Sequence, residues 1–450
     1  MTHSLSRRAL LLSSGAALAS AATGCSPGGS GRPTAAAAAA LPPRPPRQAE
    51  PAHTTSAADA PAPSPRRDLS VLPPRIHQND LRAFVVEPTG GVLATGSTTP
   101  DPNKDGDFYD KGGALVLFDV ATGGLLVSAS VAPGGVGWLG CPDGLLFSPQ
   151  GDKLMMSWDT SAVAVLDLTG GRIARMAELR IASYRGWSAP AATAWLGADH
   201  VVLEAGDLFV ARADVDAPTD KGPSVRSIPA PKDFFLASTR AAHSTVVGRV
   251  RAHGVGGRPD LAVGIDVSQG KVVFQTKLRG YAAPGDTLFS ASPGGRRAVY
   301  GDPNVTIVLD AETGSVLAES KASLRPEHAT WSRDEKRLAL VTERSILVFE
   351  DGRPTATLAR APRELLWQEL PDASPFAFSP DGERAVLLTR SGEIELLEGR
   401  GWTKRGWRKR ETSGACGVLW PRPDTIVCLG LRAITFWDAE TGSVRAQHRW

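Results

Sequence analysis

The chain has 450 residues, of which 42% are hydrophobic and 22% are charged, and it contains 47 glycines and 35 prolines. This is an ordinary globular composition with many turns. The 50 basic residues nearly balance the 47 acidic ones. Because nucleic-acid-binding proteins usually carry a clustered basic excess, the sequence argues against a nucleic-acid partner.

An export signal is predicted at the N-terminus. Arg7 and Arg8 directly precede an apolar run, Ala9–Ala22, which is too short to span a bilayer and has the length of a signal-peptide core. The two arginines resemble the twin-arginine export signal. The tetrapeptide 22–25, Ala-Thr-Gly-Cys, resembles a bacterial lipobox with Ala in place of the usual Leu. This resemblance implies a lipoprotein that begins at a lipidated Cys25, and ordinary signal-peptidase cleavage nearby is the alternative.

Residues 1–24 are thus the predicted signal peptide, and a low-complexity segment follows. Residues 25–67, which begin with Cys25, are rich in Ala, Pro and Ser. Since this composition cannot bury a core, we expect a disordered tether, which as a flexible coil would span roughly 35 Å. The predicted location is the outer face of the cytoplasmic membrane, to which the lipid anchors the exported chain.

The remaining residues, 68–450, repeat one pattern of short strands and tight turns. The clearest copy, 378–398, begins Phe-Ser-Pro-Asp-Gly and continues with two apolar runs separated by a polar break. Proline presets φ in such a turn, and Asp-Gly tolerates the reversal. An acid closes the third strand of each unit, and successive acids are 40 to 52 residues apart, the range of four-stranded propeller blades. These acids are Asp119, Asp167, Asp214, Asp266, Asp310, Glu350, Glu398 and Asp438.

The turn 378–382 and the strand 434–438, Ile-Thr-Phe-Trp-Asp, give the chain a resemblance to WD40-like and YVTN-like β-propeller repeat proteins. The resemblance implies an all-β fold of four-stranded antiparallel blades that stack around an axis, because one blade cannot bury both of its faces alone. Eight units favour eight blades. Seven is the alternative, if the weak unit at 232–278 or the irregular first unit merges with a neighbour.

Two arrangements are open for the end of the ring. The segment 444–450 supplies material for a fourth strand, so the last blade can be complete without help. The segment 69–72 has strand-like alternation and can instead add to that blade, although Pro73 and Pro74 end it at once.

The insertion in the first unit holds the best candidate for a metal site. Its oxygen-bearing residues alternate, and Gly106 falls at the sixth position, as in the first half of a calcium loop. The twelfth position is Gly112 rather than the usual glutamate, so Asp110 would have to substitute. A solvated hairpin loop is the alternative, and we expect no other cofactor. The candidate calcium ligands are Asp101, Asn103, Asp105, Asp107 and Asp110.

A basic stretch near residue 407 interleaves tryptophan with cations. Such a stretch can hold phosphates or anionic lipid head groups, and a solvated outer strand is the alternative. Its members are Lys404, Arg405, Trp407, Arg408, Lys409 and Arg410.

Two of the four cysteines, Cys416 and Cys428, lie six residues on either side of the turn near Arg422. Antiparallel pairing would place them opposite each other, so a cross-strand disulfide is predicted as one outcome after export and two buried thiols as the other. Cys141 is left without a predicted partner.

The sequence contains no linear catalytic or metal-binding histidine motif. A rigid disc of loops on a membrane tether suits recognition of a protein or polymer. From this fold and the predicted export signal we predict a non-catalytic binding or scaffold module, membrane-anchored through its lipid, monomeric, and specific for a protein or a cell-wall polymer. The alternative is an enzyme that resembles propeller lactonases or quinone-dependent dehydrogenases, with its site in the central channel.

Overall fold

A computed structural model describes His77 and residues 80–450. Within this range it leaves out 99–112, 132–141, 159–161, 170–171, 181–191, 206, 214–225, 242, 252–259, 279–286, 322–325, 360–369, 371–372, 390, 400–401, 403 and 412–413. The predicted export signal, Cys25 and the tether lie outside the described residues. Within the described part, no helix is long and apolar enough to cross a membrane.

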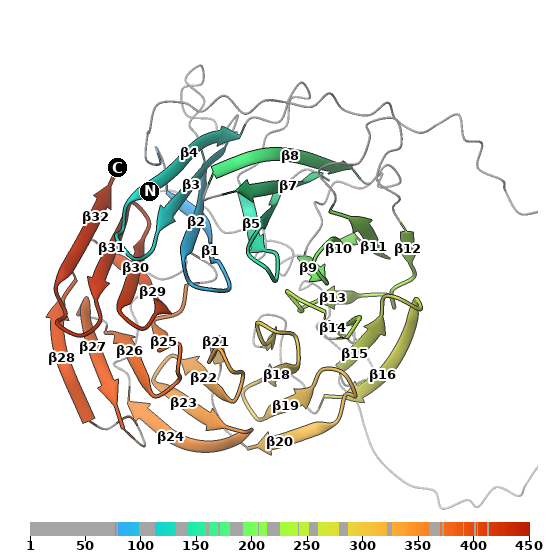
Figure 1. Ribbon diagram of the computed structural model, residues 1–450. Coiled ribbons are helices and arrows are strands. Elements are labelled where there is room, and N and C mark those ends of the chain that lie inside the picture. The colour runs from blue at the N-terminus through green and yellow to red at the C-terminus, as the bar shows by residue number, and fades with distance from the viewer. Residues whose placement is uncertain are drawn as a thin grey trace, which may run out of the picture. The chain divides into compact units, whose positions relative to one another are not determined.

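The described residues fold into eight sheets, each of four consecutive antiparallel strands in sequence order. The sheets are arranged as blades around a central axis, with the first strand of each blade innermost and the fourth outermost (Figure 1). The prediction of an eight-bladed all-β propeller is confirmed. The seven-bladed alternative is wrong, because the weak unit at 232–278 forms a complete blade of its own, β13 to β16.

The strands of the first four blades run from residue 81 to residue 277. They are β1 (Leu81–Val86), β2 (Val92–Thr98), β3 (Gly113–Asp119) and β4 (Leu125–Val131); β5 (Pro142–Phe147), β6 (Lys153–Trp158), β7 (Ala162–Thr169) and β8 (Arg172–Arg180); β9 (Ala192–Leu196), β10 (His200–Ala205), β11 (Asp207–Arg212) and β12 (Arg226–Ile228); and β13 (Phe234–Leu236), β14 (Thr245–Val250), β15 (Leu261–Asp266) and β16 (Lys271–Lys277).

The strands of the last four blades run from residue 288 to residue 449. They are β17 (Leu288–Ala291), β18 (Arg297–Gly301), β19 (Thr306–Asp310) and β20 (Val316–Ser320); β21 (Pro326–Trp331), β22 (Arg337–Thr342), β23 (Ser345–Glu350) and β24 (Arg353–Ala359); β25 (Phe376–Phe378), β26 (Arg384–Leu388), β27 (Glu393–Glu398) and β28 (Lys404–Arg410); and β29 (Ala415–Arg422), β30 (Thr425–Gly430), β31 (Ala433–Asp438) and β32 (Val444–Arg449).

Burial follows the position of a strand within its blade. The second and third strands are buried over most of their length, as in β23 and β30, because each blade packs against a neighbour on both faces. In the sequence, strands buried on both faces are short continuous apolar runs. The outermost strands, such as β16 and β32, have mostly exposed or half-buried residues. This gradient explains why the apolar runs of the middle strands gave the clearest repeat signal.

The core is divided into eight clusters, and each cluster joins two neighbouring blades. The seam between the last and the first blade is one of them, with Phe118 of β3 packed 5.8 Å from Phe436 of β31 between ring centres. Blade 8 is complete from its own strands, and its fourth strand is β32. The ring is therefore closed by packing between complete blades. The segment 69–72 lies outside the described residues.

A repeated side-chain arrangement stabilises the first turn of several blades. In blade 7, Ser379 Oγ donates a hydrogen bond of 2.5 Å to Asp381, and the backbone N–H of Arg384 donates to Ser379 Oγ at 2.9 Å. Gly382 completes the turn with φ of 75°, a left-handed conformation that glycine adopts without steric strain. The Ser-Pro-Asp-Gly signal in the sequence is thus a turn that satisfies its own polar groups.

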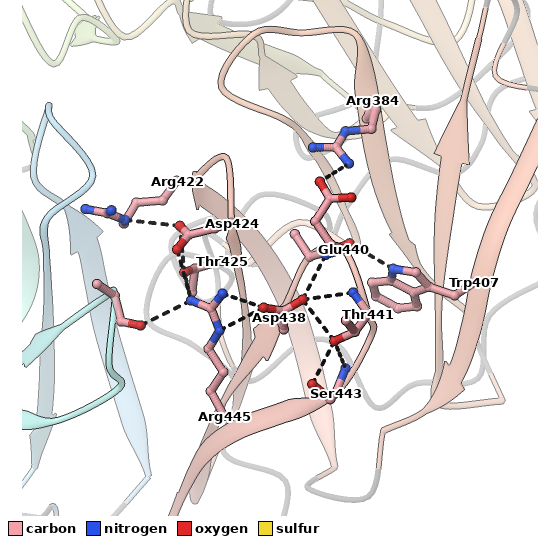
Figure 2. A network of polar contacts seen from close by, with 12 residues as sticks. Arg384, Trp407, Arg422, Asp424, Thr425, Asp438, Glu440, Thr441, Ser443 and Arg445 are labelled. Carbon is pink, nitrogen blue, oxygen red and sulfur yellow. Dashed lines mark hydrogen bonds and ion pairs between the residues drawn. The ribbon is translucent and has the colours of Figure 1, made fainter.

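In several blades the acid that closes the third strand caps the turn between the third and fourth strands. Asp438 accepts hydrogen bonds from the backbone N–H and the hydroxyl of Thr441, at 2.8 and 2.9 Å, and Figure 2 shows it between Thr441 and Arg445. The bond to Arg445, followed by those to Thr441, holds the pKa of Asp438 well below its usual value. Asp119 and Asp310 make the same bonds to Thr122 and Thr313. The regular spacing of acids thus reflects a structural cap.

Candidate functional site

The two ends of the ring differ in the connections that they carry. Because the strands of a blade alternate in direction, the turns after the first and third strands lie at one end, and the connections after the second and fourth strands lie at the other. We call these the short-turn end and the long-connection end. The long-connection end carries the segments 99–112, 132–141, 181–191, 251–260, 278–287 and 360–375. One long connection, 213–225 between β11 and β12, belongs to the short-turn end.

A buried polar network supports the long-connection end at the seam of blades 4 and 5. Arg249, at the end of β14, is 6% exposed. Its guanidinium donates to Thr287 Oγ1, and its Nε lies 3.7 Å from a carboxylate oxygen of Asp260. Thr287 and Asp260 stand where the connections 278–287 and 251–260 return to the sheet. The Arg249 side chain thus fixes the ends of two long connections.

Tyr300 on β18 and Asp302, just after this strand, extend this network. Tyr300 Oη donates to Asp302 at 3.1 Å, and Asp302 also accepts the backbone N–H groups of Asn304 and Val305 at 2.6 and 2.8 Å. Burial, followed by the Asp302 charge, raises the pKa of the Tyr300 hydroxyl, and burial lowers the pKa of Arg249. Both groups have fixed partners, so the network forms a rigid base.

The same end presents an aromatic side chain with a cation over it. Phe235, on the innermost strand β13, is 41% exposed, and the guanidinium carbon of Arg251 lies 4.9 Å from its ring centre. Cation–π pairs of this geometry are common where aromatic surface stays in contact with solvent. Sequence reasoning missed both residues, because Phe235 on β13 and Arg251 just after β14 come together only when these two strands pair.

The predicted calcium loop, with Asp101, Asn103, Asp105, Asp107 and Asp110, lies outside the described residues. It falls in the connection 99–112 between β2 and β3, and so belongs to the long-connection end. Among the residues that the structure describes, no group of three or more acids, histidines or cysteines is arranged to hold a metal ion.

The basic stretch lies on β28, the outermost strand of blade 7, and its members have different environments. Trp407 turns into the seam with blade 8, where its ring stacks on Trp437 at 6.5 Å and its indole N–H donates to the carbonyl of Ala439 at 2.8 Å. Arg408 pairs with Glu393 and Glu395. Of the described side chains, those left as exposed cations are Lys409 and Arg410. The side chains of Lys404 and Arg405 are not among those described.

The structure does not contain the cross-strand disulfide predicted between Cys416 and Cys428, since both are thiols. The register between β29 and β30 places Val418 opposite Cys428, and the β-bulge between Ala415 and Gly417 turns Cys416 to the other face of the blade. Cys416 therefore packs in the seam with blade 1 and Cys428 in the seam with blade 7. Burial, followed by the charge of Glu411, raises the pKa of the Cys428 thiol. Cys141 lies outside the described residues.

Comparison with known proteins identifies the fold and goes no further. No protein-family model matches the chain, and no curated protein does. A eukaryotic initiation factor is 14% identical, with a TM-score of 0.50 over 84% of this chain and 89% of its own. The Dos1 propeller is 12% identical, with a TM-score of 0.52 over 81% and 91%. Sqt1 of Chaetomium thermophilum is 14% identical, with a TM-score of 0.53 over 81% and 96%. The chain shares the β-propeller fold with them.

Proposed function

We propose that this protein is a membrane-anchored, extracytoplasmic binding module whose long-connection end holds a protein or a cell-envelope polymer. The observation that carries the proposal is the unequal distribution of connections: six long segments gather at one end of the ring, whereas the other end is built mainly of short turns that satisfy their own polar groups. Long connections on a rigid scaffold are where binding residues usually lie.

A buried polar network of Arg249, Tyr300 and Asp302 lies under these connections. Because it holds the ends of two connections in place, the connections lose little conformational freedom when a partner binds. Arg249 fixes the ends of two connections, and the Tyr300–Asp302 pair stiffens the adjacent strand. A site held in its binding conformation avoids part of the entropy lost on association. The exposed Phe235 with Arg251 over it offers the kind of anchor, aromatic or guanidinium, that dominates many protein interfaces.

Export and lipid anchoring are supported by the sequence at residues 7, 8 and 25. Two arginines precede an apolar run that ends at Gly-Cys, and a long low-complexity segment separates Cys25 from the first blade. Such a tether lets the propeller stand off the membrane.

The binding proposal is tested by capture from cell-envelope extract with the full chain as bait. A first variant replaces the connection 360–375 with a short Gly-Ser link. A matched variant shortens 213–225, the long connection at the opposite end. We expect a cross-linked partner to be captured by the parent chain and by the 213–225 variant, and to be lost from the 360–375 variant. Equal capture by all three chains would contradict a site at the long-connection end.

Lipid anchoring is tested by Cys25→Ala. We expect the variant to leave the membrane fraction and to lose labelling by a fatty-acid probe, because the thiol that carries the diacylglycerol is gone. A Cys141→Ala variant is the control and should label like the parent. Undiminished labelling of Cys25→Ala would refute the lipoprotein assignment.

A further inference from the structure

The outermost strand of blade 7, β28, leaves one edge of its sheet without a neighbouring strand at the rim of the ring (Figure 1). The backbone N–H of Glu411 donates to the carbonyl of Gly392 at 2.7 Å, and Lys409 lies two positions earlier in the same ladder with β27. Because the residues of an antiparallel strand turn their backbone groups alternately toward and away from the partner strand, Lys409 and Glu411 face β27. The backbone N–H and C=O groups of Arg408 and Arg410 therefore point outward, and no backbone group of another described residue bonds them.

Three consecutive exposed cations line this edge, Arg408, Lys409 and Arg410. Arg408 pairs with Glu393 and Glu395, so its charge is balanced within the blade. Lys409 and Arg410 form no salt bridge with an acid that the structure describes. Since successive side chains point to opposite faces of a sheet, a strand beside β28 has an unbalanced cation next to each of its faces. Among the described side chains of the other outermost strands, three exposed cations nowhere come together.

The neighbouring blade holds this edge in place. Trp407, the residue before the cations, stacks on Trp437 at 6.5 Å, and its indole N–H donates to the carbonyl of Ala439 at 2.8 Å, in the turn drawn in Figure 2. Gly442 leaves room for this ring, because a Cβ there would lie 2.7 Å from Trp407. A backbone edge that is already fixed in the extended conformation loses little conformational entropy when another strand pairs with it.

The chemistry of the edge decides which partner fits. Cations on an edge strand repel a second edge of the same charge, which excludes pairing of β28 with β28 of a second copy. Lipid head groups and phosphate polymers accept hydrogen bonds from cationic side chains, but they do not match the alternating N–H and C=O groups of Arg408 and Arg410. A peptide strand matches these groups, and acidic side chains on it pair with Lys409 and Arg410. The edge is therefore complementary to an extended acidic peptide.

We propose that β28 binds an extended acidic segment of a protein partner, which adds to blade 7 as a fifth strand. Main-chain hydrogen bonds to Arg408 and Arg410 supply the affinity, as in other cases of strand addition to a sheet edge. Carboxylates beside Lys409 and Arg410 add cross-strand ion pairs and select an acidic segment. This site lies on the rim of the ring and goes beyond the proposed function, which uses the long connections.

The test is titration of the full chain with a fluorescent octapeptide of alternating glutamate and threonine, followed by anisotropy at low salt. We expect a Kd of about 100 µM or lower. Two matched peptides separate charge from strand pairing. One has lysine in place of each glutamate, and the other is methylated on every backbone nitrogen, which keeps the charges and removes the N–H donors. We expect both to bind at least about tenfold more weakly.

Equal affinity for the methylated peptide would show that charge alone holds the ligand and would overturn the proposal. The absence of binding of the glutamate–threonine peptide at ~1 mM would overturn it as well.

Two double variants locate the site. Lys409→Glu with Arg410→Glu should bind the acidic peptide at least about tenfold more weakly and should bind the lysine–threonine peptide instead, because the charge of the edge is reversed. Lys409→Gln with Arg410→Gln should show the same loss without placing a new acid beside Glu393. The matched control is Lys271→Glu with Lys277→Glu, two exposed cations of the outermost strand β16, which should bind like the parent. Unchanged affinity in both variants of residues 409 and 410, or an equal loss in the control, would contradict a site on β28.

An anionic bilayer is the rival occupant, and vesicles test it. The purified Cys25→Ala chain is mixed with phosphatidylglycerol vesicles, with and without the charge reversal at Lys409 and Arg410. We expect the same bound fraction for both chains. Vesicle binding that is lost on charge reversal would assign the cations to the bilayer and overturn the proposal. The peptide titration does not depend on the connection 360–375, so its outcome and that of the capture experiment are independent.

Discussion

At the scale of single residues, His77 is the most informative buried group. It is 2% exposed, its two ring nitrogens contact the hydroxyls of Ser97 and Thr95 at 2.6 and 2.7 Å, and its ring lies 5.0 Å from that of Trp450. Burial lowers the pKa of His77 to about 3. The residue is thus neutral in the folded protein. It contacts both β2 of blade 1 and Trp450, which follows the last strand of blade 8.

This environment predicts a pH dependence of stability. The unfolded chain binds a proton at His77 below pH ~6.5 and the folded chain does not until pH ~3. The contribution of His77 is therefore fully present above pH ~6.5 and is lost as the pH falls, by roughly 1.4 kcal/mol per pH unit between pH 6 and pH 4. Denaturant unfolding of the parent and of His77→Gln across this range measures the difference. Parallel curves for the two proteins would contradict the prediction.

At the scale of elements, the turns of neighbouring blades fit against each other where glycine leaves room. Gly90, in the first turn of blade 1, has φ of 82°, and a Cβ there would lie 2.1 Å from the carbonyl oxygen of Pro421 in blade 8. Gly197 has φ of 65°, but a Cβ there would meet nothing within 4 Å. The two glycines share a backbone conformation and differ in what surrounds them.

The comparison predicts different costs for the same substitution. Gly197→Ala should lower the free energy of unfolding by about 1 kcal/mol, which is the left-handed strain alone. Gly90→Ala should lower it by at least ~2 kcal/mol more, because a backbone carbonyl of another blade has to move. Chemical denaturation of both variants measures the difference. Equal losses would show that the turn of blade 1 is not held against blade 8.

At the scale of the whole molecule, the ring closes without exchanging a strand between its ends. Blade 1 and blade 8 are both complete, and their seam contains Phe118, Phe436 and the ring of His448, which lies 5.0 Å from Phe118. The Arg445 guanidinium donates to the carbonyl of Ala121 at 3.2 Å across this seam. The closing seam thus has the same kind of apolar core as the seven others, with polar bonds at its edge.

Closure by ordinary packing predicts that the closing seam is as costly to damage as an internal one. Phe118→Ala should lower the free energy of unfolding by about 3–5 kcal/mol, and unfolding should remain a single transition. Phe349→Ala, in the seam between blades 5 and 6, is the matched control and should lose a similar amount. A much smaller loss for Phe118→Ala, or a separate early transition of blade 1, would show that the ring opens there first.

The sequence by itself determined the propeller of four-stranded blades and the position of most turns, and it favoured eight blades over seven. These features depend on local chemistry: Asp438 caps the turn that follows it through Thr441, three residues later, and Gly382 supplies a left-handed φ that few other residues tolerate. They could therefore be read from spacing and residue type.

Only the tertiary structure decided which side chains meet between blades. The register of β29 and β30 and a β-bulge place Cys416 and Cys428 on opposite faces of blade 8, and Trp407 turns from the predicted basic surface into a seam. Arg249, Glu335 and His77 likewise take their partners from strands or turns distant in sequence. The repeated sequence pattern specifies the strands and turns inside each blade. The contacts between blades depend on how neighbouring blades pack against one another, and no local sequence pattern encodes that geometry.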